Sequence, residues 1–392
     1  MASFRILVLG DFGAAAAPAR LVLVDRDNLE QVMKRLDVRL ELPGAGTLRF
    51  NELDDFHPDR LYQSLDLFKG LREMRAYAED PEFRTSTPQP PGVSLLDEIV
   101  DAGAAVAARK KDPLQEYLQD VVAPYIVPLD PKKGDRIAQV DAATSEAMRA
   151  LLHDRRFQAL EAAWRALDFL VRRTDAKVRA LHLPKEKLAA DLLYRALRDD
   201  PADLIAANYS FGPGNEDIEM MGRVALLAST ANSPMIARAD AALLGDAQEL
   251  AAWSELQKIP EARYIGLALP GFLLRLPYGK ETSPIDAFAF EEATPELKHS
   301  EYLWGNPAFA CAYLAAEAPE LDIENLPAHV YKKDGETVMK PCAEVLMTES
   351  EAEALIDRGL IPLLSMRDSD RVHVAGLRSI NGHPLFSGVN RM

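Results

Sequence analysis

Cysteine and positive charge are both scarce in this chain of 392 residues. Its two cysteines, Cys311 and Cys342, are too few for the disulfide framework of a secreted domain, and they favour a reducing, cytoplasmic setting. Lysine and arginine number 45 against 61 aspartates and glutamates, so the formal net charge is −16. Because nucleic-acid phosphates are bound by Lys and Arg, this balance argues against a nucleic-acid partner. The acidity favours solubility and electrostatically matched partners.

Long apolar runs are also missing. The uncharged run Val224–Ala237 is shorter than the roughly 18 to 20 residues that a membrane-spanning helix needs. Near the N-terminus, Ile6–Gly10 is too short for the apolar region of a signal peptide, and Asp11 interrupts it. We therefore expect no export signal and no membrane insertion.

Motifs that carry chemistry are absent or incomplete. The DFG at 11–13 has no kinase catalytic loop or glycine-rich nucleotide loop beside it, so it predicts a turn. A calcium loop over 25–36 fails at the required Gly and Glu positions. Asp54, Asp55 and His57 are explained by a helix start, and the loop 211–215 lacks the end of a phosphate-binding loop. We predict no catalytic, cofactor-binding or metal-binding residues, and no enzyme.

The most distinctive stretch is Tyr264–Tyr313, where aromatic residues, prolines and glycines stand densely between apolar residues. Leu267–Leu276 predicts a buried segment that turns at Pro270-Gly271. Arg275 lies inside this apolar run, and an unpaired buried charge is very unfavourable, so we expect a carboxylate partner or an exposed surface position. Asn306-Pro307 predicts the cap and first residue of a helix.

Residues before the first linker predict short strands and two helices. Asp27 is expected to cap the first helix, whose apolar face comprises Leu29, Val32, Met33 and Leu36. Pro58 is expected to begin the second helix, with Leu61, Leu65, Phe68 and Leu71 on one face. Strands are predicted over 4–9, 21–24 and 48–53.

A proline-rich linker over 81–93 precedes a helical segment that starts at Ser94. Helices are predicted over 135–149 and 153–173. The second has a buried stripe of Phe157, Leu160, Trp164, Leu167 and Val171. Its opposite side is strongly basic, which fits either a solvated face or a docking face for an acidic neighbour.

From Lys177 onward, strands and helices alternate, which predicts a mixed α/β fold with layered sheets and flanking helices. Thr348 is expected to cap a helix. A hairpin is expected from 328–332 and 337–339. The remaining predicted strands are 178–183, 204–209, 235–237, 360–366 and 372–377, and the remaining helices are 185–198, 218–231 and 247–257.

Several motifs resemble the large subunit of the type VI secretion contractile sheath, the TssC/VipB/ImpC family. They are RLPYG at 275–279, FEE at 290–292, YLWGNPAFA at 302–310 and EVLMTESEAEALIDRGLIPL at 344–363. The order of LLDEIV and HDRRFQALEAAWRALDFLVRRT also resembles the start of that subunit. This resemblance covers about residues 94–380.

An earlier part of the chain resembles the small sheath subunit, the TssB/VipA family. It contains VDRDNLEQVMKRL at 24–36 and LRFNELDDFHPDRLYQSLDLFKGLREMR at 48–75. Leu29 replaces the usual Phe of that family. The two resemblances divide the chain into a small-subunit-like segment (1–80), the linker (81–93), the helical segment (94–176) and a large-subunit-like α/β core (177–392).

The resemblance implies a contractile-sheath-like fold and a structural protein without enzymatic activity. In the family, small and large subunits assemble into a tube around the inner Hcp tube, with strands exchanged between protomers. Implied partners are other sheath subunits or copies of this chain, Hcp, baseplate components and a ClpV-type AAA+ ATPase.

The chain also departs from the family, and two alternative functions stay open. The family's large subunits continue beyond the position of Met392, and their free N-terminal helix corresponds to an internal position near Ser94. A sheath-like accessory or adaptor that binds or caps a sheath is therefore a second hypothesis. An enzyme with a site near Tyr209–Asp217 or Arg275 is the rival from another class.

Overall fold

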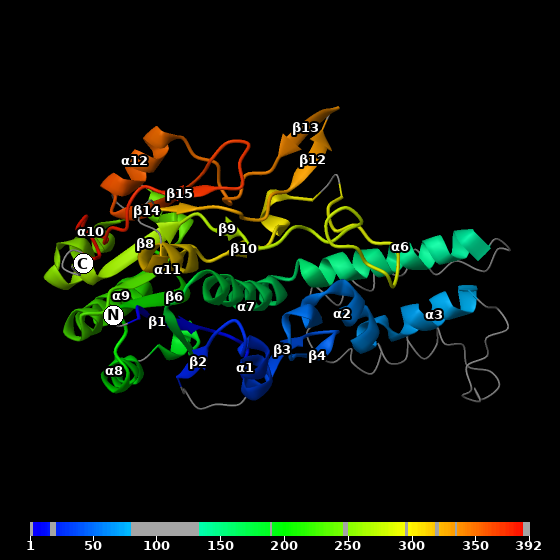
Figure 1. Cartoon of the computed structure of the whole chain (residues 1–392), viewed down its shortest axis with the longest axis horizontal. Helices are drawn as coiled ribbons and strands as arrows, with labels where there is room; N and C mark the ends of the chain where they lie inside the picture. The colour runs from blue at the N-terminus through cyan, green and yellow to red at the C-terminus, as the bar shows by residue number, and fades with distance from the viewer. Residues whose placement is uncertain are drawn as a thin grey trace.

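The computed structural model describes residues 3–15, 21–79, 133–188, 190–245, 250–294, 297–317, 321–333 and 335–386. A body containing a large sheet lies at one end, and a pair of helices extends from it along the long axis (Figure 1). The expected mixed α/β fold with flanking helices is confirmed. None of the helices in these ranges has both the length and the apolar character needed to cross a membrane.

A nine-stranded sheet forms the centre of the body, in the order β11-β15-β14-β8-β7-β6-β1-β5-β2. The strands from β14 to β5 in this order run parallel, whereas β2, β15 and β11 are antiparallel to their neighbours. Parallel neighbours need a long crossover, which explains the alternation of strands and helices along the chain. The strands are Arg5–Gly10 (β1), Val22–Val24 (β2), Lys177–His182 (β5), Leu204–Phe211 (β6), Met235–Ala239 (β7), Ile265–Leu269 (β8), Asp322–Ile323 (β11), Leu360–Ser365 (β14) and Val372–Val374 (β15).

Helices cover both faces of this sheet. On β1, Ile6 and Val8 belong to one core, whereas Leu7 and Leu9 belong to the other. Because such strands are buried on both faces, they are continuous apolar runs in the sequence. The first core contains residues of α7 (Arg155–Arg173) and α11 (Pro307–Glu317), and the second contains residues of α8 (Ala190–Asp199), α9 (Asn215–Ala231) and α10 (Ala251–Lys258).

The N-terminal residues are part of the same sheet. β1 lies between β5 and β6, with Ile6 opposite both Val178 and Leu204. The segment that resembles a small subunit therefore contributes a central strand to the body. Its other elements are α1 (Leu29–Leu36), β3 (Val38–Leu42), β4 (Gly46–Phe50), η1 (Leu53–Phe56), α2 (Pro58–Ser64), η2 (Asp66–Phe68) and α3 (Lys69–Glu79).

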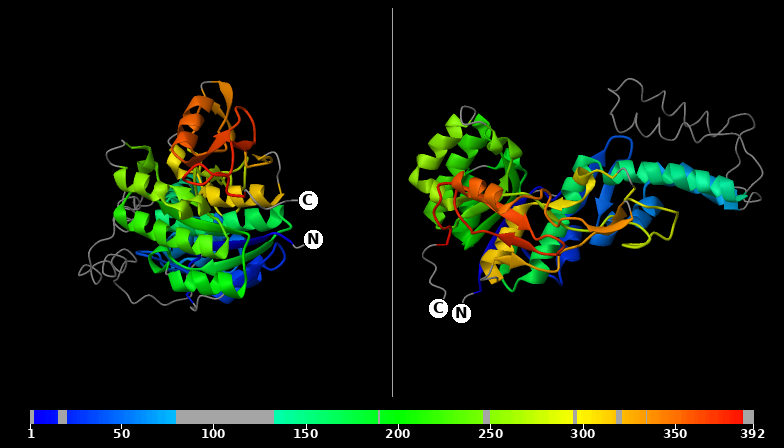
Figure 2. Two further views of the ribbon diagram at one scale, coloured as in Figure 1. Left: turned by 90° about the vertical axis from the view of Figure 1, so that its left-hand side faces the viewer. Right: turned by 90° about the horizontal axis from the view of Figure 1, so that it is seen from above.

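α3 and α6 (Lys133–Leu152) lie side by side and form the extension, here called the arm (Figures 1 and 2). Arg75 on α3 donates from Nε to Asp141 Oδ1 on α6 at 2.9 Å. α7 begins as a separate helix because the Asp154 carboxylate accepts bonds from the N–H groups of Arg156 (2.9 Å) and Phe157 (3.2 Å). The predicted helices over 135–149 and 153–173 are thus confirmed, with small shifts at their ends.

The expected cap at Asp27 is wrong, and Asn28 occupies the N-cap position of α1. The reason is a local turn: Asp25 Oδ1 accepts bonds from the N–H groups of Asp27 and Asn28, both at 2.9 Å. Such side-chain-to-backbone bonds compete with helix capping. The buried face of α1 is nevertheless confirmed for Leu29, Val32 and Met33.

The single helix expected from Pro58 through Leu71 is also wrong, because the chain is extended at Leu65 (ψ 135°) between α2 and η2. The guanidinium of Arg72 donates to the carbonyl oxygens of Tyr62 and Leu65, which satisfies groups exposed by the break. The strand expected over 48–53 ends at Phe50, and its partner β3 in the hairpin was not predicted.

Later boundaries differ in several places. The strand expected over 372–377 ends at Val374, and the helix expected over 218–231 begins at Asn215. The helix expected over 185–198 divides into η4 (Lys185–Lys187) and α8, and the helix expected from 247 begins at Ala251. The linker over 81–93 and the helix start at Ser94 lie outside the described residues. The predicted hairpin is confirmed as β12 (Val330–Lys333) and β13 (Glu336–Met339), and Thr348 caps α12 (Glu349–Asp357). Shorter elements are η5 (Ala241–Leu244), η6 (Pro260–Tyr264), β9 (Phe272–Leu273), η7 (His299–Glu301) and β10 (Trp304–Gly305).

Candidate functional site

Arg275 lies at the centre of a buried charge cluster with Glu161, Glu292, Arg165 and Tyr278, here called the Arg275 cluster. Arg275 Nε donates to Glu161 Oε1 and its Nη1 to Glu292 Oε2, both at 2.8 Å. Nη2 makes longer bonds of 3.3 Å to the second oxygen of each carboxylate. The Glu161 side chain is fully buried, and 3% of the Glu292 side chain is exposed. The expected pairing of Arg275 with a carboxylate is confirmed.

The other members of the cluster complete its hydrogen bonding. Arg165 lies one turn after Glu161 on α7 and donates from Nε to Glu161 Oε1 at 2.7 Å. Its Nη2 donates to the Tyr278 hydroxyl at 2.9 Å. The guanidinium carbon of Arg275 is 4.1 Å from the centroid of the Tyr278 ring, which is within cation–π range. Positive and negative charges are therefore balanced inside the cluster.

Burial and ion pairing fix the protonation states of two members of the cluster. Burial would raise the pKa of Glu292, but the Arg275 guanidinium, together with the neighbouring His153 and the backbone N–H of Tyr278, outweighs burial and lowers that pKa to about 2. Burial raises the pKa of Tyr278 to about 12, so its hydroxyl stays protonated. His153 Nε2 lies 3.5 Å from Glu292 Oε1, too far for a well-formed hydrogen bond. Glu292 and Tyr278 thus hold fixed protonation states at neutral pH, unlike a general acid or base.

Sequence reasoning identified Arg275 but missed Glu161. Glu161 lies between Phe157 and Trp164 on the helix, at the four- and three-residue spacings that share one face. A carboxylate beside a buried stripe must itself be paired, and this was the available signal. Nothing local in the sequence connects α7 to Arg275, because they are 114 residues apart.

The basic side of α7 is partly engaged within the chain. Arg172 Nε contacts Asp168 Oδ1 at 2.6 Å. Arg173 donates to the backbone carbonyls of Glu324 (2.7 Å) and Asn325 (2.6 Å). These bonds attach the segment after β11 to α7, so part of the basic face has a structural role.

Polar groups in the region near Tyr209–Asp217 bond to each other and to neighbouring residues of the chain. The Tyr209 hydroxyl donates to the Leu183 carbonyl, and Gly212 N donates to Asp217 Oδ2 at 2.7 Å. Lys185 Nζ lies 2.6 Å from Asp217 Oδ1. In the described parts of the chain, no three His, Cys, Asp or Glu side chains gather closely enough to hold a metal ion. The absence of a cofactor or metal stays a prediction.

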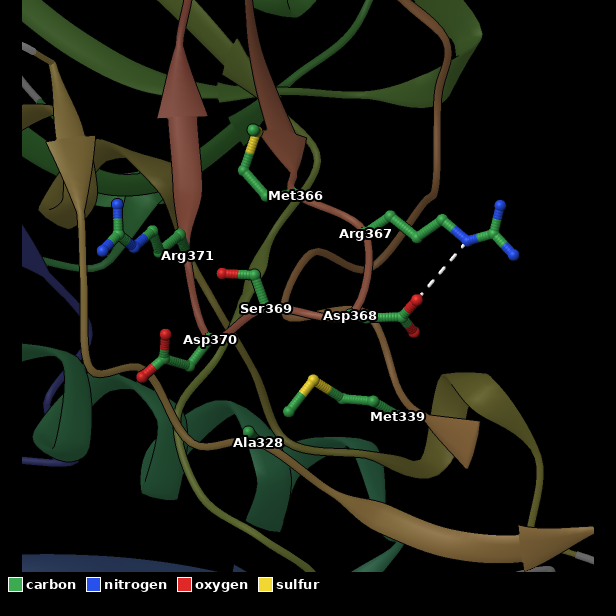
Figure 3. Close-up of a pocket in the computed structure, with 8 residues that line it drawn as sticks. All are labelled: Ala328, Met339, Met366, Arg367, Asp368, Ser369, Asp370 and Arg371. Atoms are coloured by element: carbon green, nitrogen blue, oxygen red, sulfur yellow. Dashed lines mark ion pairs between the residues drawn. The ribbon is translucent and has the colours of Figure 1, made fainter. Parts of the chain in front are cut away.

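A wide hollow of about 570 Å³ lies between the base of the β12–β13 hairpin and the turn after β14. Figure 3 shows Arg367 extending away from the other labelled side chains, joined to Asp368 by an ion pair of 3.6 Å. Two methionines, Met339 and Met366, supply its apolar part. Neither a nucleophile–base pair nor a phosphate-binding loop is present among its lining residues, which are Ala328, Met339, Met366, Arg367, Asp368, Ser369, Asp370 and Arg371.

We expect the protein to lose stability as the pH falls from about 7.5 to about 5.5. Burial lowers the pKa of His57, His182, His299 and His329 below the ordinary histidine value. The unfolded chain then binds protons more readily than the folded chain, so the free energy of unfolding falls as the pH drops below about 6.5. Urea unfolding at the two pH values measures this loss, and equal midpoints would contradict it.

His329 provides a variant that tests the cause. Its Nδ1 lies 2.8 Å from the Tyr302 hydroxyl, and burial raises the pKa of Tyr302 to about 12, so the hydroxyl is the donor. In His329→Gln, the amide oxygen can accept the same bond without titrating. This variant should therefore lose less stability between the two pH values than the native chain does.

Comparison with known proteins gives a family match. The model of the VipB family, described as EvpB/VC_A0108, tail sheath N-terminal domain, matches residues 134–204 and 194–381. This match contains α6, α7, the sheet strands from β5 onward and all members of the Arg275 cluster. Residues 5–75 lie outside it, so their resemblance to a small sheath subunit stays a prediction.

A curated relative agrees with the family match. The chain is 28% identical over 300 residues to the type VI secretion system sheath protein TssC1 of Pseudomonas aeruginosa. The aligned region covers 62% of this chain and 60% of that relative. The chain therefore matches less than two thirds of the relative's length.

Proposed function

Because the chain belongs to the VipB family of tail sheath proteins, we propose that it is a structural component of a type VI secretion contractile sheath. The single observation that carries this proposal is the family match across the α/β body. The Arg275 cluster supports it, since its buried ion pairs join the stretch Tyr264–Tyr313 to α7 and so have a structural role. The relative named as a type VI sheath protein gives further support.

We also propose that residues 1–80 act as a small-subunit-like part of the same protomer, joined to the helical segment (94–176) and the α/β core (177–392). Phe50 and Phe56 support this, because their rings lie 6.0 and 5.7 Å from that of Phe157 on α7. These aromatic contacts join the N-terminal segment to the family-matched body. The proposed partners are sheath subunits or copies of the chain, and then Hcp, the baseplate and a ClpV-type ATPase, in the cytoplasm.

Electron microscopy of the purified chain, alone and mixed with full-length small and large sheath subunits, tests the sheath function. We expect the chain to form tubes or to be incorporated into tubes along their length. Density only at tube ends would instead favour an adaptor that caps the sheath. Omitting the small subunit from one mixture tests whether residues 1–80 take its place.

A control mixture replaces the chain with an unrelated protein of similar negative charge, because a net charge of −16 can produce non-specific attraction. Absence of both tubes and binding in every mixture would contradict the sheath function. Incorporation that requires a separate small subunit would contradict only the role proposed for residues 1–80.

A further inference from the structure

Residues 278–292 form a loop whose two ends meet at a neck. Glu292 N donates to the Tyr278 carbonyl at 2.8 Å, and Tyr278 N donates to Glu292 Oε2 at 2.7 Å. The structure describes every residue of this loop, and its only regular pairing is an isolated bridge between Gly279 and Ser283. A surface loop of this length with joined ends is an Ω-loop. We call it the clasp loop.

The outer part of the clasp loop binds α2. Asp59 accepts bonds from the N–H groups of Asp286 (3.1 Å) and Ala287 (2.9 Å) through its two carboxylate oxygens. The adjacent Phe288 ring lies 4.9 Å from the ring of Tyr62, also on α2. The loop therefore holds one α2 residue by hydrogen bonds and a second by aromatic packing.

The returning part of the clasp loop binds α6. Ser145 Oγ donates to the Ala289 carbonyl at 2.8 Å, and Asp141 Oδ2 accepts from Ala289 N at 3.3 Å. Arg149 Nε donates to the Glu291 carbonyl at 3.0 Å. Since Asp141 also binds Arg75 on α3, one carboxylate joins the loop and both helices of the arm. The loop thus connects α2, α3 and α6.

The neck differs from the rest of the core because charges hold it. Glu292 closes the neck and also forms an ion pair with Arg275, so the neck and the Arg275 cluster share one carboxylate. Pairing buried charges gains little net free energy over leaving them hydrated. Opening the neck, so that water solvates Arg275 and Glu292, therefore costs less free energy than opening a neck held by apolar contacts would.

We propose that the clasp loop is a conformational clasp, whose neck opens at Glu292 and thereby frees α2 and α3 as one unit while the nine-stranded sheet stays folded. The same loop contacts α2 and α6, so opening its neck weakens both attachments together. Regions of a protein commonly open in such cooperative units, with stabilities below that of the whole fold. The inference concerns motion within one chain and does not depend on assembly into a sheath.

Native-state hydrogen exchange of the full chain, followed by mass spectrometry, tests the proposal with Glu292→Gln. This change preserves the size of the side chain but removes its charge. We expect exchange to accelerate by about tenfold or more in 278–292 and by a similar factor in α2 and α3, as for a lost charged hydrogen bond. Peptides from β6, β7 and β8 should stay more protected than these segments in both the native chain and the variant, because they open only when the whole fold unfolds.

A second variant, Asp59→Asn, weakens the contact between α2 and the outer part of the clasp loop. Asp59 accepts hydrogen bonds from two loop N–H groups, one on each carboxylate oxygen. In asparagine one of these oxygens becomes an NH₂ group, which cannot accept a bond, so the attachment is weakened far from the neck. A single cooperative unit predicts faster exchange at Tyr278 and Glu292 in this variant as well. Acceleration confined to residues near the substitution, or protection of α2 and α3 in the native chain equal to that of the sheet, overturns the proposal.

Arg5→Gln is the matched control. Arg5 also binds a carboxylate, that of Asp203, at 3.1 Å, but it joins β1 to the residue before β6 rather than to the clasp loop. Its loss should leave exchange in 278–292, α2 and α3 unchanged. If this variant accelerates those segments as much as Glu292→Gln does, the coupling is a general loss of stability and the proposal is overturned.

Discussion

Replacing Arg275 with methionine is expected to lower the free energy of unfolding by about 3 to 5 kcal/mol, the usual effect of removing one partner from a buried ion pair. The change leaves Glu161 and Glu292 buried, with 0% and 3% of their side chains exposed. Arg165 still binds Glu161, so Glu292 loses its main partner and drives the loss. Urea unfolding followed by circular dichroism measures the effect.

Two further variants distinguish charge from packing at this position. Arg275→Lys preserves the charge but cannot bind both carboxylates in the bidentate manner of a guanidinium, so we expect an intermediate loss. The double variant Arg275→Met with Glu292→Gln removes one charge of each sign, and its loss should be smaller than the sum of the single losses. Strictly additive losses would mean that Arg275 and Glu292 do not stabilise the fold through each other.

Replacing Trp164 with alanine is expected to lower the free energy of unfolding by about 3 to 5 kcal/mol. Trp164 is 0% exposed and packs edge-to-face on Phe12, with ring centroids 5.3 Å apart. Its indole N–H donates to the Phe12 carbonyl at 3.1 Å. Truncation therefore creates a cavity and leaves that carbonyl without its partner, and urea unfolding followed by circular dichroism reports the loss.

Trp164→Phe is the matched control, because it fills most of the cavity and removes only the indole N–H. It should lose clearly less stability than the alanine variant does. Arg172→Ala, on the exposed side of the same helix, should change stability by no more than about 0.5 kcal/mol. Equal effects of all three variants would contradict the assignment of Trp164 to the core.

Local signals in the sequence predicted many elements of the fold. The apolar runs at β1, β6 and β7 were recognisable because strands buried on both faces are continuous apolar segments. Capping chemistry correctly located the starts of α11 and α12, where Asn306 and Thr348 accept backbone bonds. The errors at Asp27 and Leu65 arose where nearby side chains, those of Asp25 and Arg72, bond to the backbone and stabilise a turn or a break in the helix.

The order of the sheet was not readable from the same signals. β1 and β5 are neighbours although 166 residues separate the end of Arg5–Gly10 from the start of Lys177–His182.

 Residues 11–176 thus lie between two strands that pair directly, and no short-range pattern specifies such a neighbour. Only the packing of helices on both faces brings these strands together.

The sequence by itself determined which segments are apolar, where most helices begin, that Arg275 needs a partner, and that the Tyr264–Tyr313 stretch is distinctive. These properties follow from side-chain chemistry and short-range spacing. Tertiary structure decided the partners: Glu161 lies 114 residues from Arg275 and Glu292 lies 17 residues away. It also decided that the stretch contains a clasp loop over the arm, because contacts between distant residues form only when the chain has folded.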